Sequence, residues 1–242
     1  MQKQTFLQRF WALFDPAGTK KYVTQISLIL LSLYIATSVD RCKEANKDQA
    51  KLQEYLRAIQ VDIKEEIKVD AMNLGDCEQD IKNLGLMLYY AKMPQPDSVE
   101  LAMNNFAQVF WRGVFRGFHP TTFDLMMESG DANLLKDINL RNKLATVFAF
   151  RRTVIQADLA QFDQQTSLCA AELGKYVDLA RYLFVEEFDI KCVIDREGFA
   201  RSPHNEVFLL HRLANLRAFH LENALEDLKE VEKLLTEHTK TF

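Results

Sequence analysis

Apolar and polar residues follow one another along this chain mostly in steps of three and four, which is typical of helices, except in one run near the start. That run extends from Tyr22 to Val39 and contains no charged residue. Because a helix needs roughly 20 mostly apolar residues to cross a bilayer, the run predicts a transmembrane helix over residues 20–40. A buried helix of a soluble protein and a cleaved signal peptide are the alternatives. We favour an uncleaved anchor because Ala36-Thr37-Ser38 is a poor cleavage site.

The segment before this run is amphipathic. Its apolar residues fall at helical spacing: Phe6, Leu7, Phe10, Trp11 and Phe14. A short helix of this kind suits the membrane interface, so residues 1–17 are expected to form an interfacial helix. The alternative is a short helix that packs against the protein itself.

A long helix is predicted from Lys43 to about Lys92. Apolar residues in its first and last parts step by three and four: Leu52, Leu56, Ile59, Ile63, Leu74, Cys77, Ile81, Leu84 and Leu88. Between these parts Ile63, Ile67 and Ala71 step by four twice, which predicts a stutter in a coiled-coil-like stripe. Glu65 and Glu66 are expected on the solvated face. The stripe could bind a helix of another chain or one of the same chain.

The middle of the chain predicts several helices. One extends over Val99–Phe118, and a short one begins at Thr121 or Thr122 and is closed by Ser129-Gly130. Asp137 or Asn139 is expected to cap a long helix that reaches about Leu183. The β-branched run from Ile190 to Ile194 could form a strand, although a lone strand would have nothing to pair with.

Ser202-Pro203 is a favourable start for the last helix. Its seam alternates steps of three and four, and only Arg217 is polar in it: Val207, Leu210, Ala214, Arg217, Leu221, Ala224, Leu228, Val231 and Leu235. We expect this helix to lie antiparallel to the first long helix, with the middle helices at the membrane-distal end.

These patterns predict an all-α fold, in which an interfacial helix and a transmembrane helix precede an elongated helical bundle with two long coiled-coil-like helices. The predicted organisation is 1–17 interfacial helix, 20–40 anchor and 41–242 soluble domain. The low counts of Gly (8) and Pro (5) agree with long helices rather than with an all-β protein rich in turns.

The charge of the chain limits the kinds of molecule that it is expected to bind. The net charge is −4, and residues 1–38 carry Lys3, Arg9, Lys20 and Lys21 against Asp15, so the main domain is acidic. An acidic domain makes nucleic acid an unfavourable partner. Basic residues flank the apolar run on both sides in equal number, so they do not decide its orientation.

The residues that could carry chemistry show no recognisable pattern. The five histidines lack HExxH spacing, and no nucleotide-binding loop or GxSxG motif is present in the sequence. Cys42, Cys77, Cys169 and Cys192 have no CxxC spacing; a disulfide among the last three stays open. Cys169 is expected to be a buried thiol rather than a nucleophile. The sequence therefore predicts no enzyme, no catalytic residue, no cofactor and no metal site.

The segment from Thr121 to Leu144 resembles a motif in a family of uncharacterised membrane proteins from Bacteroidetes-type bacteria. The matching positions are Thr121, Phe123, Leu125, Ser129, Gly130, Leu140, Arg141 and Leu144. The chain departs from the family in its Ser- and Thr-rich span and at Phe148 and Phe150. The resemblance implies a single-pass inner-membrane protein with a cytoplasmic N-terminus and a periplasmic main domain. It implies no catalytic residues. In the motif, Arg141 is expected to pair with Asp124 or Glu128.

Two functional hypotheses follow. The first is a membrane-anchored interaction or scaffold protein, either an accessory subunit of an inner-membrane complex or a homo-oligomer joined through the Leu52–Leu88 stripe. Its partners would be the lipid bilayer and other subunits or a second copy. The second is a membrane-anchored periplasmic sensor that binds a small molecule among Phe106, Phe110, Phe115 and Phe148. A hydrolase with an unfamiliar site ranks last.

Overall fold

The computed structural model of the chain is helical. It describes residues 16–93, 95, 97–112, 121–185, 192–201 and 204–240, and the side chains of 16–24, 183–185, 204 and 240 are not described. The elements in order are α2 (Pro16–Ala91), α3 (Asp97–Trp111), α4 (Thr122–Glu128), η1 (Asp131–Leu134), α5 (Ile138–Phe150), η2 (Arg151–Ile155), α6 (Gln156–Leu173), α7 (Leu179–Val185), α8 (Arg196–Arg201) and α9 (His204–Lys240). The prediction of an all-α fold is confirmed for this part of the chain.

The chain divides into two compact units, residues 1–54 and 55–242. In the first unit the described residues all belong to α2, which begins at Pro16 and continues without a break past residue 40. The predicted interfacial helix 1–17 lies outside the described residues apart from Pro16 and Ala17, which belong to α2.

Within the described residues, no helix has the length and apolar character needed to cross a membrane. The predicted anchor covers residues 20–40, and the side chains of residues 20–24 lie outside the described part.

In the second unit α2 has one continuous buried seam, so the predicted stutter is wrong. The seam alternates steps of three and four through Leu56, Ile59, Ile63, Glu66, Asp70, Asn73, Cys77, Asp80, Leu84, Met87 and Ala91. Sequence analysis followed only apolar residues and therefore missed the polar positions in the middle. Glu66 is largely buried in this seam, contrary to its expected place on the solvated face, whereas Glu65 is exposed as predicted.

The long middle helix forms as α5, η2 and α6, and Asp137 caps its start by accepting from the backbone of Asn139 and Leu140. It ends at Leu173, about ten residues earlier than predicted. The η2 segment is a π-helix, and its residues Arg151 and Ile155 are both buried.

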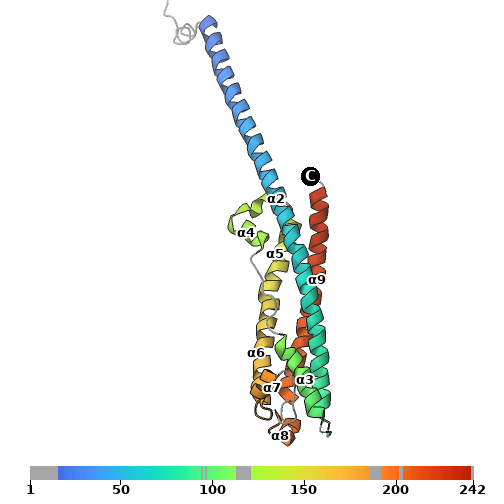
Figure 1. The fold of residues 1–242 in the computed structure, drawn as a ribbon. Helices are drawn as coiled ribbons and strands as arrows, with labels where there is room; N and C mark the ends of the chain where they lie inside the picture. Colours follow the sequence, from blue (N-terminus) through green and yellow to red (C-terminus); the bar gives the residue numbers. More distant parts are fainter. Residues whose placement is uncertain are drawn as a thin grey trace, which may run out of the picture. The chain divides into compact units, whose positions relative to one another are not determined.

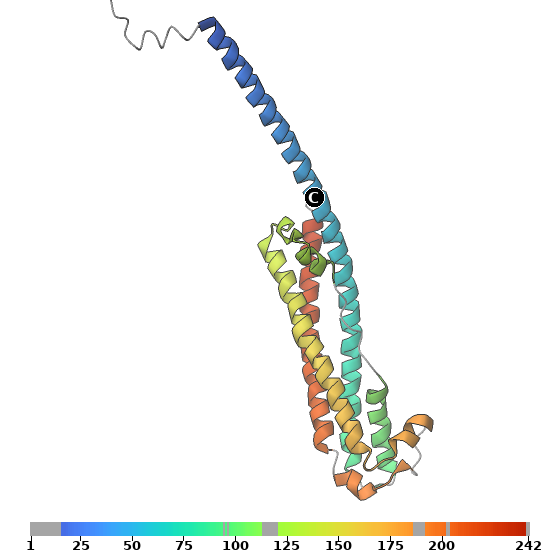
Figure 2. The same ribbon diagram turned by 90° about the vertical axis from the view of Figure 1, so that its left-hand side faces the viewer.

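The predicted seam of α9 is confirmed at every position, because all nine of its side chains are buried. Contacts between distant residues show that α9 is antiparallel to α2, as expected: Gln60 donates to Thr236 at 3.0 Å, and Arg217 donates to Cys77 at 2.8 Å. Within this unit α2, α5–α6 and α9 lie side by side, and only α9 runs in the opposite direction (Figures 1 and 2). The middle helices α5–α6 therefore pack along α9 rather than forming a distal part.

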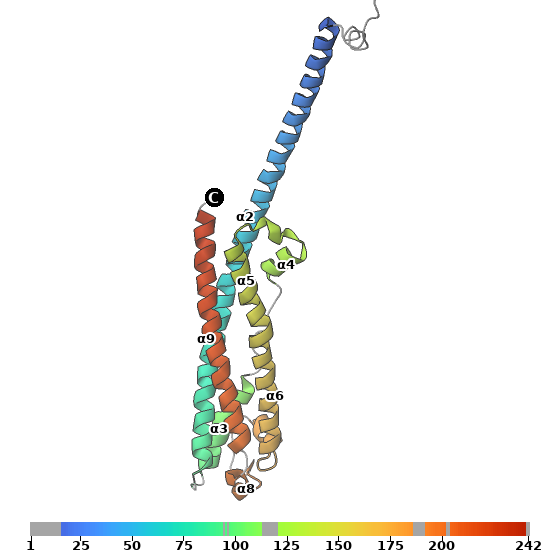
Figure 3. The ribbon, with the colours of Figure 1, turned by 180° about the vertical axis from the view of Figure 1, so that it is seen from behind.

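Three shorter helices, α3, α7 and α8, gather where this stretch of α2 ends (Figures 1 and 3). The predicted helix 99–118 appears as α3 from Asp97 to Trp111, and residues 113–120 lie outside the described part. Of the possible strand at 190–194, residues 190 and 191 lie outside the described part, and Val193 forms one isolated antiparallel bridge with Val177.

The motif from Thr121 to Gly130 folds as its residue types dictate. Thr121 caps α4 in a reciprocal capping box with Asp124, and Ser129 ends the helix. Gly130 follows with φ +78°, the left-handed region that glycine adopts without steric cost.

We expect Gly130→Ala to lower the free energy of unfolding by about 1 kcal/mol, because a Cβ is disfavoured at positive φ. The matched control is Gly75→Ala, on an exposed face of α2 where a Cβ meets no atom within 4 Å. That change should raise the stability by about 0.5–1 kcal/mol because Ala has the higher helix propensity. Urea unfolding of the full chain measures the free energy of unfolding of both variants. Equal changes in the two variants would contradict the left-handed conformation of Gly130.

Candidate functional site

The interior of the second unit holds charged groups that α2 supplies from its seam. In the first group, which we call the Arg151 cluster, the guanidinium of Arg151 on η2 donates to the carboxylates of Glu66 and Asp70 on α2. Arg151 and Asp70 are at most 2% exposed. Arg151 is the first residue of the π-helical segment η2, so the buried ion pair lies at an irregularity in the long middle helix.

The pKa of Asp70 in this cluster departs from its ordinary value. Burial raises the pKa of Asp70 to about 6; Arg151 opposes this rise and Glu66 adds to it. The Oδ1 atom of Asp70 is buried and has no hydrogen-bond partner among the described residues. A carboxyl that is removed from water in this way takes up a proton more readily than an exposed one.

A second group, the Arg217 cluster, lies further along α2. Asp80 accepts from Arg112 at 2.8 Å and from Arg217 at 3.1 Å, and Arg112 also reaches Asp76 at 2.8 Å. The guanidinium carbon of Arg217 lies 4.1 Å from the ring centre of Phe162 on α6. Two guanidinium groups thus face two carboxylates, and an aromatic face covers the buried cation.

The thiols of the interior are not arranged for catalysis. Burial raises the pKa of Cys77, beside Arg217, and raises that of Cys169 to about 12. A thiol of this kind stays protonated at neutral pH and is a poor nucleophile. The prediction that Cys169 is buried is confirmed. All four cysteines, Cys42, Cys77, Cys169 and Cys192, are free, and only Cys42 is exposed.

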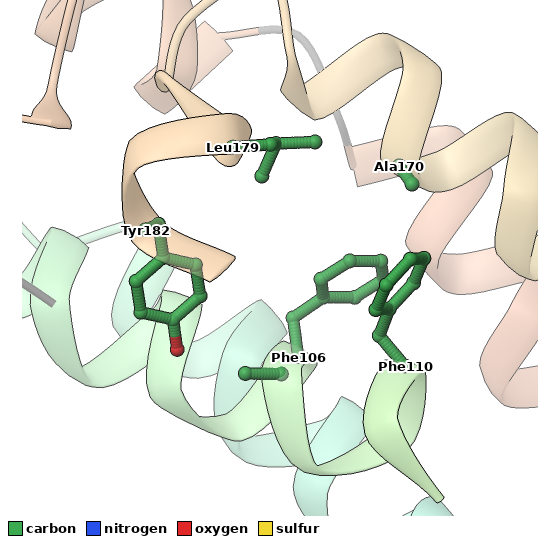
Figure 4. A pocket seen from close by; sticks show the side chains of 6 residues that line it. Phe106, Phe110, Ala170, Leu179 and Tyr182 are labelled. Carbon is green, nitrogen blue, oxygen red and sulfur yellow. The ribbon is translucent and has the colours of Figure 1, made fainter. Parts of the chain in front are cut away.

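The aromatic residues proposed to hold a ligand do not come together around one cavity. Phe106 and Phe110 line a small cavity with Ala107, Ala170, Leu179 and Tyr182 (Figure 4). Its volume is about 10 Å³, which is about the space of a single water molecule. Phe148 instead stacks on Phe123 with ring centres 5.7 Å apart, and Phe115 lies outside the described residues.

The Tyr182 hydroxyl at this cavity is engaged with the protein. It donates to the carbonyl of Met103 at 3.3 Å and lies 3.2 Å from Oδ1 of Asn104. Burial raises the pKa of Tyr182 to about 12, so the group is neutral at physiological pH. This corner of the fold is therefore packed core with a small void.

Sequence analysis identified one of the buried charges and missed the others. Arg217 stood out because it interrupts an otherwise apolar seam, and its burial is confirmed. Asp70, Asp80 and Arg151 gave no such signal, but extending the three-four rhythm of α2 through polar positions would have found the two aspartates. The expected pairing of Arg141 with Asp124 or Glu128 is not found among the described residues, and Asp124 pairs with Arg152 instead.

Comparison of the chain with protein-family models, with curated proteins and with solved structures gives no match. In the part of the chain that the structure describes, no group of three or more His, Cys, Asp or Glu side chains is placed to hold a metal ion.

We predict that Arg151→Met lowers the free energy of unfolding by about 3–5 kcal/mol at pH 7, because it leaves two buried carboxyl groups without their cation. The neighbouring Arg152→Met is the control. Arg152 is 52% exposed and pairs with Asp124 at the surface, so its loss should cost less than about 1 kcal/mol. Denaturant unfolding measures the loss of stability in both variants. A similar loss in the two variants would contradict the buried position of Arg151.

A pH dependence follows from Asp70. Its pKa in the folded chain, about 6, is above the ordinary value near 4, so the folded state binds the proton more tightly and loses stability as the pH rises through this window. We expect the stability of the wild type relative to Asp70→Asn to fall by about 2–3 kcal/mol between pH 4 and pH 7. Unfolding curves of both proteins at several pH values measure this difference in stability. A difference that does not change with pH would refute the raised pKa of Asp70.

Proposed function

We propose that this chain is a membrane-anchored helical interaction protein, with residues 20–40 in a bilayer and residues 55–242 as the body that binds other subunits or a second copy. The observation that carries the anchor is the exposure of the apolar run of α2. Its large apolar side chains are 46% to 70% exposed: Ile26, Leu28, Ile29, Leu30, Leu31, Leu33, Tyr34, Ile35 and Val39. Leu28 to Leu31 are consecutive and therefore point to all sides of the helix, and a helix that is apolar all round needs an apolar surrounding.

The polar residues of this run fit the same proposal. The hydroxyl of Ser32 donates to the carbonyl of Leu28 at 2.5 Å, and that of Thr37 donates to the carbonyl of Tyr34 at 3.0 Å. Hydroxyl groups that bond back to their own helix add little cost in a lipid environment. The likeness of residues 121–144 to an inner-membrane family supports a cytoplasmic N-terminus and a periplasmic body.

An interaction role is favoured over catalysis and over ligand sensing by the distribution of polar groups in the body. Among the described residues, its buried charges pair with one another in the Arg151 and Arg217 clusters and do not line the cavity at Phe106. The cavity at Phe106 is too small for a ligand beyond a water molecule. The part of the Leu52–Leu88 stripe that lies in the body packs inside it, with Leu56, Ile59 and Ile63 fully buried, so a partner must bind elsewhere.

Membrane fractionation tests the anchor. The full chain should remain in the membrane pellet after alkaline carbonate, whereas Leu30→Glu with Leu33→Glu should move most of it to the supernatant, because each buried charge opposes insertion by about 2.5–3.5 kcal/mol. The control is Val61→Glu with Met72→Glu, which changes two exposed apolar residues of the same helix outside the run. A wild-type chain released by carbonate, or a Leu30 and Leu33 variant that stays in the pellet, would overturn the proposal.

A further inference from the structure

Two histidines of α9 contact aspartates of the long middle helix. Near the middle of α9, Nδ1 of His220 lies 2.6 Å from Oδ2 of Asp158 on α6. Near the end of α9, Nε2 of His238 lies 2.7 Å from Oδ2 of Asp137, the residue that caps α5. An ionised carboxylate only accepts hydrogen bonds, so the protons on each imidazole ring decide whether these contacts hold.

The ring of His238 lies between two acceptors. Its Nε2 atom faces the carboxylate of Asp137, and its Nδ1 atom lies 3.1 Å from the carbonyl oxygen of Leu234, one turn back on α9. A neutral imidazole has one N–H group, so both contacts are hydrogen bonds only when the ring is doubly protonated. The position near the end of α9 also favours a cation, because the last carbonyl groups of a helix carry partial negative charge.

Asp137 uses both of its carboxylate oxygens in this arrangement. Its Oδ1 atom accepts from the backbone N–H groups of Asn139 and Leu140 at 2.8 and 3.0 Å, and its Oδ2 atom faces His238. The bond from Leu140 lowers the pKa of Asp137, burial opposes this effect, and the bond from Asn139 and the contact with His238 add to it. The carboxyl group is therefore ionised at neutral pH and connects the start of α5 to the end of α9.

We propose that His238 and Asp137 form a pH-sensitive latch that holds the last turns of α9 against the start of α5. When the ring is doubly protonated, both of its contacts are hydrogen bonds. When the ring loses a proton, one of its nitrogens presents a lone pair to an acceptor, and the end of α9 opens more often. Histidine is the side chain type whose charge ordinarily changes between about pH 5 and pH 8, so the latch weakens as the pH rises through neutrality.

The groups around the latch are of kinds that keep their charge in this pH range. On the side of α2 the contact with this end of α9 is neutral, because Gln60 donates to Thr236 at 3.0 Å. Carboxylates, amines and guanidinium groups ordinarily do not titrate near neutral pH. The charged residues with described side chains that lie within four positions of Gln60, Asp137 or His238 in the sequence are Arg57, Asp62, Lys64, Lys136, Arg141 and Glu237.

His220 provides a matched control on the same pair of helices. Its Nδ1 atom makes the contact with Asp158, and its ring packs edge-on against Phe150 with ring centres 6.0 Å apart. A neutral ring that keeps its proton on Nδ1 still donates to Asp158. The contact of His220 therefore persists when the ring loses its charge, whereas His238 loses one of its two contacts.

Amide hydrogen exchange of the full chain in detergent tests the latch. We expect the protection factor of residues 231–240, corrected for the intrinsic exchange rate, to fall about three- to tenfold between about pH 5.5 and pH 8.5, because one hydrogen bond is lost. The middle of α9, residues 210–224, is measured in the same samples and corrects for any change in the stability of the whole body. His238→Gln should abolish the additional fall at the end of α9, and His220→Gln should leave it in place. No additional fall in the wild type, or one that persists in His238→Gln, would rule the latch out.

Asp137→Asn gives a second test with the opposite sign. Asn is as good an N-cap as Asp, so its side-chain oxygen still accepts from the start of α5, and its NH2 group then faces Nε2 of His238. A neutral ring accepts from this NH2 group and donates through Nδ1 to Leu234, whereas a doubly protonated ring cannot accept. In this variant the protection of residues 231–240 should rise with pH instead of falling. A fall of the same size as in the wild type would show that another group titrates and would exclude the latch.

Discussion

The fold of residues 55–242 depends on the neutralisation of carboxyl groups that lie in the middle of an apolar seam. Asp70 and Asp80 occupy positions of α2 where an isolated coiled coil would carry leucine, and both are at most 1% exposed. An ionised carboxylate that is buried without a partner costs several kcal/mol. Arg151 from the middle helix and Arg217 from α9 therefore have to arrive at fixed points along α2.

This requirement sets the register of the three long helices more strictly than apolar packing does. A shift of α9 by one heptad would bring Leu210 or Ala224 to the place of Arg217 opposite Asp80, and the carboxyl group would lose this partner. The apolar seams alone would tolerate such a shift, because most of their residues are interchangeable aliphatic side chains. The ion pairs add little net stability compared with aliphatic residues of similar size, and their effect is to disfavour the wrong registers. The π-helical segment η2 belongs to the same arrangement, because it carries Arg151, the partner of Asp70.

The sequence predicts much of this fold where one physical signal dominates. The apolar seam of α9, the caps at Thr121 and Asp137 and the left-handed turn at Gly130 all follow from residue type and spacing, and each is confirmed. The predictions fail where the polarity of a residue indicates exposure but its spacing along the helix indicates burial. The polar seam positions of α2 resemble a stutter because the burial of a charge depends on a partner that is distant in sequence. The pairing of Asp124 with Arg152 rather than Arg141 was missed because both arginines are near enough in sequence to reach it.

The central claim is that the charges of α2 are coupled to those of the neighbouring helices, and a double-mutant cycle on Asp80 and Arg217 measures that coupling most directly. Unfolding free energies of Asp80→Asn, Arg217→Met and the double variant give the interaction energy of the pair, whose atoms lie 3.1 Å apart. The account predicts a coupling of about 2 kcal/mol or more, with the double variant more stable than the sum of the single losses implies. Additive losses within about 0.5 kcal/mol would contradict it.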